Sequence, residues 1–123
     1  MSDGNYPPPP DDEARKLGRG IAFIEAFRSV EPSMSANYAV AFMAVALRPG
    51  LGVTAYAKQL GLTRPGASRV LGEIGQRTRA IKGGAGLGLV DSVPNAEDRR
   101  NVEFFLTPKG KRLLGQVLAH IGR

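Results

Sequence analysis

The pattern of apolar and polar positions divides this chain into five predicted helices and one predicted hairpin. Leu17, Ile21 and Ile24 recur at helical spacing, which predicts a helix over about residues 12–31 with an unusually wide apolar stripe. A second stretch, over about 35–47, is apolar nearly all round, and this pattern is typical of a buried central helix.

The middle of the chain has the pattern of a helix–turn–helix. A short helix over 55–60 is expected after an extended link at 52–54, and Gly61 supplies the left-handed residue that the turn needs. Thr63 is expected to cap the next helix, over about 63–82. Early positions of such a helix reach base edges in the major groove, so it is the candidate recognition helix.

After a glycine-rich link, the spacing of apolar residues changes from that of a helix to the alternation that is typical of β-strands. Residues 87–93 predict one strand and residues 101–106 predict the return strand. The turn between them carries two adjacent arginines, Arg99 and Arg100. A stiff two-stranded ribbon holds such cations out from the surface, where they can grip phosphates or enter a groove.

The last predicted helix starts at Thr107 and runs to about Ile121, and its apolar stripe has little core left to cover within one chain. We therefore expect it to pair, together with the first helix, with a second copy of the chain. The residues expected at this dimer contact are Leu17, Ile21, Ile24, Phe27, Leu114, Val117, Leu118 and Ile121.

The expected fold class is mostly α with a small β-hairpin wing (α+β), a winged helix–turn–helix that dimerises through its N- and C-terminal helices. Residues 1–10 include four consecutive prolines and are expected to form a disordered tail. Residues 11–123 are expected to form one domain.

Positive charge is concentrated in one part of the chain. The formal net charge is +6, but residues 1–50 carry five Lys/Arg against six Asp/Glu, whereas residues 51–123 carry twelve against five. The excess falls on the segment that holds the predicted helix–turn–helix and hairpin, which favours a polyanion as partner. The alternative is a basic face that serves only solubility.

The residue types give little basis for catalysis or metal binding. The chain has no cysteine, a single histidine at position 120, and no paired carboxylates or nucleophile–base pattern. We therefore expect no enzyme activity, no metal site and no cofactor. No apolar run reaches membrane-spanning length and no secretory signal opens the chain, so we expect no membrane partner and a cytoplasmic, nucleoid-associated location.

Three motifs resemble the MarR family of bacterial and archaeal regulators. They are Gly88-Leu89-Val90, Asp98-Arg99-Arg100 and Leu106-Thr107-Pro108-Lys109-Gly110, and the upstream stretch TAYAKQLGLTRPGASRVL resembles the family's helix–turn–helix. The similarity covers roughly residues 35–120. It implies a homodimeric winged helix that binds a pseudo-palindromic double-stranded DNA, often as a repressor that a small-molecule effector can release.

On this resemblance the recognition helix would enter the major groove and the wing, about residues 88–106, would enter the minor groove. Asp98 would orient one of the two wing arginines. The residues expected to contact DNA are Thr63, Arg64, Ser68, Arg69, Asp98, Arg99 and Arg100, together with a basic ridge of Arg77, Arg79 and Lys82 that faces either phosphates or solvent.

Three features depart from the family pattern. The segment between the Ser68-Arg69 pair and Gly88 is longer than usual, and Ser92 stands where the family often has an arginine. The chain also ends before the family's second C-terminal helix, so the dimer is expected to use the first and last helices alone. A winged helix that binds only proteins, as an antirepressor or accessory factor, is the alternative function. If Arg64, Arg69, Arg77 and Arg99 do not lie on one face, DNA binding loses its support and this alternative gains.

Overall fold

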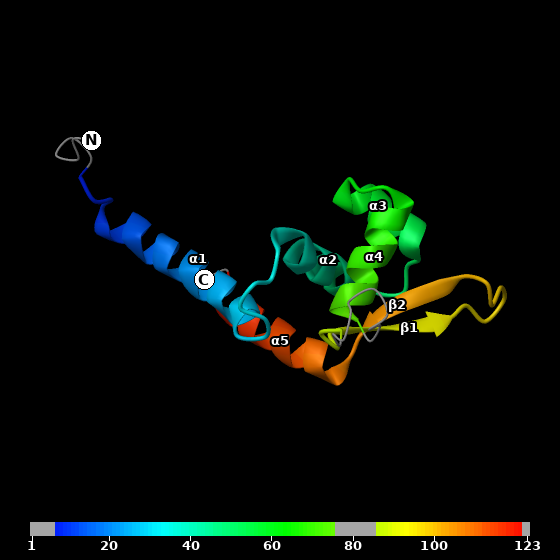
Figure 1. Cartoon of the computed structure of the whole chain (residues 1–123). Coiled ribbons are helices and arrows are strands. Elements are labelled where there is room, and N and C mark those ends of the chain that lie inside the picture. The colour runs from blue at the N-terminus through cyan, green and yellow to red at the C-terminus, as the bar shows by residue number, and fades with distance from the viewer. Residues whose placement is uncertain (1–6, 76–85, 122–123) are drawn as a thin grey trace.

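The computed structural model describes residues 7–75 and 86–121. Within these residues the chain forms five helices and a two-stranded antiparallel hairpin, which confirms the predicted winged-helix fold class (Figure 1). The elements are α1 (Asp11–Arg28), α2 (Ala36–Leu47), α3 (Val53–Leu60), α4 (Arg64–Ile74), β1 (Val90–Pro94), β2 (Val102–Leu106) and α5 (Pro108–Ala119).

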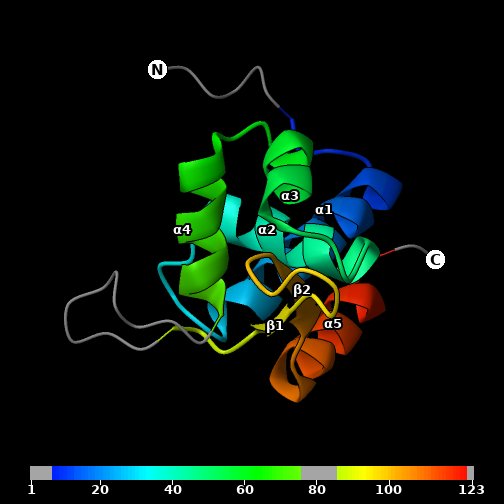
Figure 2. The ribbon, with the colours of Figure 1, turned by 90° about the vertical axis from the view of Figure 1, so that its right-hand side faces the viewer.

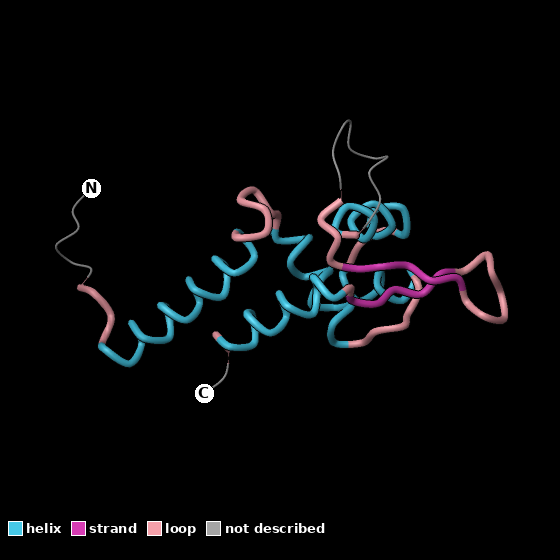
Figure 3. Tube along the Cα trace, turned by 90° about the horizontal axis from the view of Figure 1, so that it is seen from below, coloured by secondary structure: helices cyan, strands magenta, loops and turns pink. Residues whose placement is uncertain are grey.

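The molecule is elongated, with the terminal helices at one end and the hairpin tip at the other (Figures 1 and 3). Helices α1 and α5 pack against each other, and the N-terminal half of α1 projects past the end of α5. Seen along the hairpin, α4 lies on one side of the wing and α5 on the other (Figure 2). The wing and α4 are therefore presented together at one end.

Helix α2 is the central helix of the core, as its apolar pattern predicts. Phe42 of α2 is fully buried and meets Phe27 of α1 edge to face, with ring centroids 5.7 Å apart. Tyr56 of α3 is also fully buried and meets Phe104 of β2 in the same way at 6.2 Å. The first contact joins α1 to α2 and the second joins α3 to the hairpin, and all four side chains belong to one buried core.

Three helices have side-chain N-caps, and among them is the predicted cap at Thr63. The side-chain oxygens of Ser35, Thr63 and Thr107 accept hydrogen bonds from the backbone N–H groups three residues later. The turn before α4 has Gly61 in the left-handed conformation, with φ of +68°. Local signals thus placed the starts of α2, α4 and α5 correctly.

The predicted extended link at 52–54 is wrong, because α3 already begins at Val53 with Gly52 as its N-cap. The extended part lies just before it. The N–H of Gly50 donates to the carbonyl of Phe104 at 2.8 Å, and the N–H of Phe104 donates to the carbonyl of Leu51 at 3.1 Å. The loop before α3 is therefore attached to β2.

The predicted recognition helix over 63–82 is too long, because α4 ends at Ile74. Gly75 is extended, with φ of −101° and ψ of −141°. The last carbonyls of the helix are taken by a distant segment: the N–H groups of Leu87, Gly88 and Leu89 donate to the carbonyls of Glu73, Gly75 and Ile74 at 3.0, 2.8 and 2.8 Å.

This use of residues 87–89 also explains why β1 starts at Val90 rather than at the predicted residue 87. At the other end, β1 runs to Pro94, one residue beyond the predicted strand, and Pro94 pairs with Val102. The predicted basic ridge of Arg77, Arg79 and Lys82 lies outside the described residues.

The start of α5 closes onto the same segment. The Thr107 hydroxyl donates to the carbonyl of Gly88 at 2.6 Å, and the Thr107 N–H donates to the carbonyl of Leu89 at 3.0 Å. Gly110 allows this approach, because a Cβ there would lie 2.1 Å from the Leu89 carbonyl oxygen. The end of α4, the start of β1 and the start of α5 are thus one hydrogen-bonded junction.

Two glycines of α5 should therefore respond oppositely to the same substitution. Gly110→Ala is expected to lower the free energy of unfolding by about 3 kcal/mol or more, because the methyl group clashes with backbone that cannot move away. Gly115→Ala meets nothing within 4 Å and should raise the free energy of unfolding by about 1 kcal/mol through better helix propensity. Urea denaturation followed by circular dichroism measures both, and equal effects would contradict the close packing at Gly110.

Candidate nucleic-acid interface

Two of the predicted DNA-contacting arginines face one cleft. Arg64, at the start of α4, and Arg100, at the tip of the wing, line a cleft of about 430 Å³ whose floor is the loop and first turn at residues 50–55. The Arg64 Nε donates to the Thr54 hydroxyl at 3.0 Å, which directs the guanidinium along the start of α3. The structure therefore brings together a cation from the recognition helix and one from the wing.

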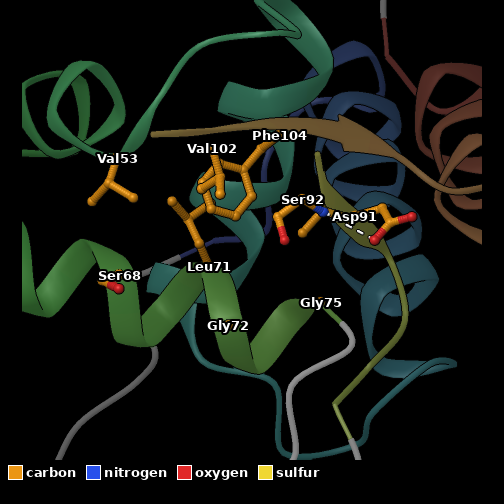
Figure 4. A pocket seen from close by; sticks show the side chains of 10 residues that line it. Val53, Ser68, Leu71, Gly72, Gly75, Asp91, Ser92, Val102 and Phe104 are labelled. Atoms are coloured by element: carbon orange, nitrogen blue, oxygen red, sulfur yellow. Dashed lines mark hydrogen bonds between the residues drawn. The ribbon is translucent and has the colours of Figure 1, made fainter. Parts of the chain in front are cut away.

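Ser68 lies one turn after Arg64 on the face of α4 that is turned toward the wing. It lines a smaller hollow of about 110 Å³ between α4 and the hairpin. Figure 4 shows Ser68 and Val53 at one end of this hollow and Ser92 and Asp91 at the other. The hollow adjoins the arginine cleft, since Val53 and Val102 line both.

Thr63 and Arg69 have different surroundings. Thr63 is exposed, but its hydroxyl oxygen already accepts the N–H of Gly66 at 3.1 Å as the helix cap. Arg69 is exposed and lies close enough to Tyr38 of α2 that its positive charge affects the pKa of that phenol. Arg69 is not among the residues that line the Arg64–Arg100 cleft, so the predicted recognition-helix residues are spread over two sides of α4.

The wing tip is held in shape by two side chains. The Asn95 side-chain oxygen accepts the N–H groups of Glu97 and Asp98 at 2.8 and 3.0 Å, and the Asp98 carboxylate accepts the backbone N–H and the Nε of Arg100, both at 3.2 Å. The Arg100 side chain is nevertheless 90% exposed. Asp98 thus orients Arg100 outward, while Arg99 is simply exposed.

The bonds to Arg100 hold the pKa of the Asp98 carboxyl below its ordinary value, the side-chain bond contributing most and the backbone bond second. Asp98 therefore remains charged, and its contacts remain formed, at neutral pH. Asn95 was not predicted as part of this site, although its place beside a proline in a turn between two strands is a recognisable turn signal.

A second unpredicted pair positions the recognition helix. The Tyr38 hydroxyl of α2 donates a short hydrogen bond to the buried Glu73 carboxylate of α4. This bond, and secondarily burial, raises the pKa of Tyr38 to about 12. Glu73 is the only acidic residue between Glu31 and Asp91. Its isolation in a basic segment was the sequence feature that could have singled it out as part of a specific contact.

The residues predicted for a dimer contact divide into exposed and buried groups. Ile21 of α1 is 64% exposed and Leu118 of α5 is 55% exposed, whereas Phe27 and Val117 are only 2% and 1% exposed and belong to the core of the single chain. Phe27 is therefore not available to a second chain, whereas Val117, although buried, also lines the apolar groove between α2 and α5. Leu17, Ile24 and Ile121 are also exposed, and Leu114 is half-buried.

Helix α2 contributes to the same surface, which the sequence pattern did not predict. An open apolar groove of about 350 Å³ runs between α2 and α5. Leu47, at the end of α2, is 71% exposed at its edge. The residues that line this groove are Met43, Ala46, Leu47, Leu114, Val117, Leu118 and Ile121.

Within residues 7–75 and 86–121, no group of three or more His, Cys, Asp or Glu side chains is placed to hold a metal ion. In the same part of the chain, no helix combines the length and apolar character needed to cross a membrane.

The fold matches several solved structures, some of which are described as transcription regulators. RV1404 from Mycobacterium tuberculosis is 18% identical, and the match covers 88% of this chain and 66% of that one with a TM-score of 0.63. The MarR family transcription regulator SP03579 is 24% identical, with 85% and 63% covered and a TM-score of 0.58. CouR, a transcriptional repressor solved bound to a 23-mer DNA duplex, is 22% identical, with 88% and 68% covered and a TM-score of 0.56.

These matches confirm, at the level of the fold, the resemblance to MarR-family regulators. The chain spans about two thirds of the length of RV1404 and SP03579. No protein-family model and no curated protein sequence matches the chain.

The contact between Asp98 and Arg100 can be tested by a pH titration of the Asp98 carboxyl carbon in NMR spectra. We expect a midpoint below the ordinary value of 3.8, because the bonds to Arg100 favour the charged carboxylate. The stability that these bonds give the folded protein is complete above pH 3.8 and is lost as the pH falls through the pKa of Asp98 in the folded state. Arg100→Gln should raise the midpoint toward 3.8. Arg99→Gln removes an equal charge without touching Asp98 and should change it little; equal shifts in the two variants would exclude the specific bond.

Proposed function

We propose that this chain is a homodimeric, sequence-specific DNA-binding transcriptional repressor that acts in the cytoplasm at the nucleoid. The observation that supports this most strongly is the cleft that Arg64 of α4 shares with Arg100 of the wing. Two cations from separate elements, one of them oriented by Asp98, fit a polyanion that both elements contact at once. A winged helix that binds only proteins has no need of this arrangement.

The two arginines have different tasks in this proposal. Arg64 lies at the N-terminal end of α4, the part of a recognition helix that reaches base edges, and its guanidinium can bond guanine O6 and N7 together. Arg100 lies at an exposed turn and suits a narrow minor groove, where an arginine responds to groove shape. Ser68 extends the contact along the side of α4 that faces the wing, and Arg99 adds charge at the wing. Arg69 lies on another side of α4 and is not part of this contact.

A second copy of the chain is the proposed occupant of the exposed apolar surface. Leu17, Ile21 and Ile24 form an exposed apolar stripe along α1, and the groove between α2 and α5 is lined only by apolar side chains. A two-fold axis would let each α1 cover the groove of the other chain. Exposed apolar surface of this extent on one face is typical of an interface.

Dimerisation determines how the two α4–wing units are arranged on the DNA. Because α1 and α5 lie at the end of the molecule opposite the wing, pairing there leaves two α4–wing units free to bind one duplex. Two-fold symmetry implies an inverted repeat, and half-sites about one helical turn apart place both α4 helices on the same side of the duplex. A dimer that covers such a site can block transcription, and this is the basis of the repressor assignment.

Substitution of the two arginines should have distinguishable effects on DNA binding. Arg64→Ala is expected to cost about 1–3 kcal/mol on the preferred duplex and to relax its preference at one base position per half-site. Arg100→Ala should weaken binding to all sequences and lower the slope of log K against log salt by about one per subunit. Fluorescence anisotropy with matched and scrambled duplexes measures both.

Arg28→Ala is the matched control for these variants, because Arg28 is paired with Glu25 on α1 at 2.7 Å. It should leave both the affinity and the salt slope unchanged. Failure of the wild-type protein to retain any duplex at low salt would refute the proposed function and favour a protein-binding winged helix.

The dimer can be tested by placing charges on the apolar surface. Ile21→Glu and Leu118→Glu should each convert the protein from a dimer to a single chain of 13.1 kDa in sedimentation velocity, because an unpaired carboxylate would be buried at the contact. Val93→Glu, at an exposed position of β1, should remain a dimer. A wild-type protein that stays monomeric at every concentration would rule the interface out.

A further inference from the structure

A second basic hollow lies beside the Arg64–Arg100 cleft and was not predicted from the sequence. Arg48, just after α2, and Lys58, in α3, line a hollow of about 360 Å³, together with Gln59. Leu51 and Ala55 line both this hollow and the cleft, so the two are neighbours on the surface.

The backbone that carries Arg48 is firmly held. The buried Tyr56 hydroxyl donates to the carbonyl of Arg48 at 2.5 Å and accepts the N–H of Leu51 at 3.3 Å. The same loop is hydrogen-bonded to β2 through Gly50 and Leu51. Because Tyr56 and Lys58 both belong to α3, the bond from Tyr56 fixes the backbone of Arg48 relative to that of Lys58. The same loop is held on the wing by its hydrogen bonds to β2.

Within residues 7–75 and 86–121, neither Arg48 nor Lys58 forms an ion pair with a carboxylate. The stretch from Pro32 to Gly72 contains four cationic residues and no acidic one. Arg28 and Arg100, by contrast, are paired with Glu25 and Asp98. Two exposed cations around one hollow, without counter-charges, suit an anionic partner that brings its own charge.

We propose that Arg48 and Lys58 bind phosphodiester groups of the DNA backbone next to the stretch of duplex that faces the Arg64–Arg100 cleft. This inference rests on the proposed function and adds a phosphate-binding site to it. An ammonium and a guanidinium suit phosphate oxygens, and the Gln59 amide supplies a neutral donor at the same rim. Phosphate contacts fix the position of the protein on the duplex without reading its sequence.

The test compares the double variant Arg48→Gln/Lys58→Gln with the wild-type protein in salt titrations of duplex binding. Loss of two phosphate contacts should lower the slope of log K against log salt by about two per subunit. The ratio of affinities for matched and scrambled duplexes should stay unchanged, because no base contact is lost. Thermal unfolding of the variant checks that the end of α2 is still folded.

The matched control is Arg15→Gln/Lys16→Gln, which removes two exposed charges from the projecting half of α1, at the opposite end of the molecule from the wing tip. It should keep the wild-type slope. If both double variants lower the slope equally, the effect is one of overall charge and the assigned site is wrong.

Two further outcomes separate this inference from the proposed function. If Arg48→Gln/Lys58→Gln binds like wild type while Arg64→Ala loses affinity, the phosphate site is refuted and the regulator assignment stands. If the wild-type protein binds no duplex, both are refuted. Inorganic phosphate at constant ionic strength should not displace DNA; displacement that depends on Arg48 and Lys58 would identify a small-anion site instead.

Discussion

The geometry of this protein depends on one hydrogen-bonded junction. The N–H groups of residues 87–89 satisfy the last carbonyls of α4, and Thr107 binds the same three-residue segment from the side of α5. Helix ends otherwise leave carbonyls without partners, so these bonds both end the recognition helix and fix where the wing begins. The distance between α4 and the wing is thereby set by backbone hydrogen bonds and not by side-chain packing alone.

The junction also connects the terminal helices to the surface that we assign to DNA. Gly88 has φ of +71°, which favours glycine, and Gly110 lets α5 approach the Leu89 carbonyl. These two glycines give a physical reason for the Gly-Leu-Val and Leu-Thr-Pro-Lys-Gly motifs. Since α5 packs on α1, the bonds of Thr107 also connect the terminal helices to the start of the wing.

Sequence reasoning succeeded where the causes are local and failed where they are distant. The caps at Ser35, Thr63 and Thr107 and the buried character of α2 depend on neighbouring residues, and all were predictable. The end of α4 depends on a segment more than ten residues away, so helical spacing overestimated its length. Phe27 and Val117 share a helical stripe with exposed residues, and only the packing of α1 on α5 shows which edge is buried.

The most direct test of the account is to select bound duplexes from a random pool and to determine the mass of the complex with the winning sequence. Two copies joined through their terminal helices should enrich an inverted repeat with half-sites about ten base pairs apart, and the complex should contain two chains per duplex. Enrichment of a single unrepeated site bound by one chain, or no enrichment at all, would contradict it.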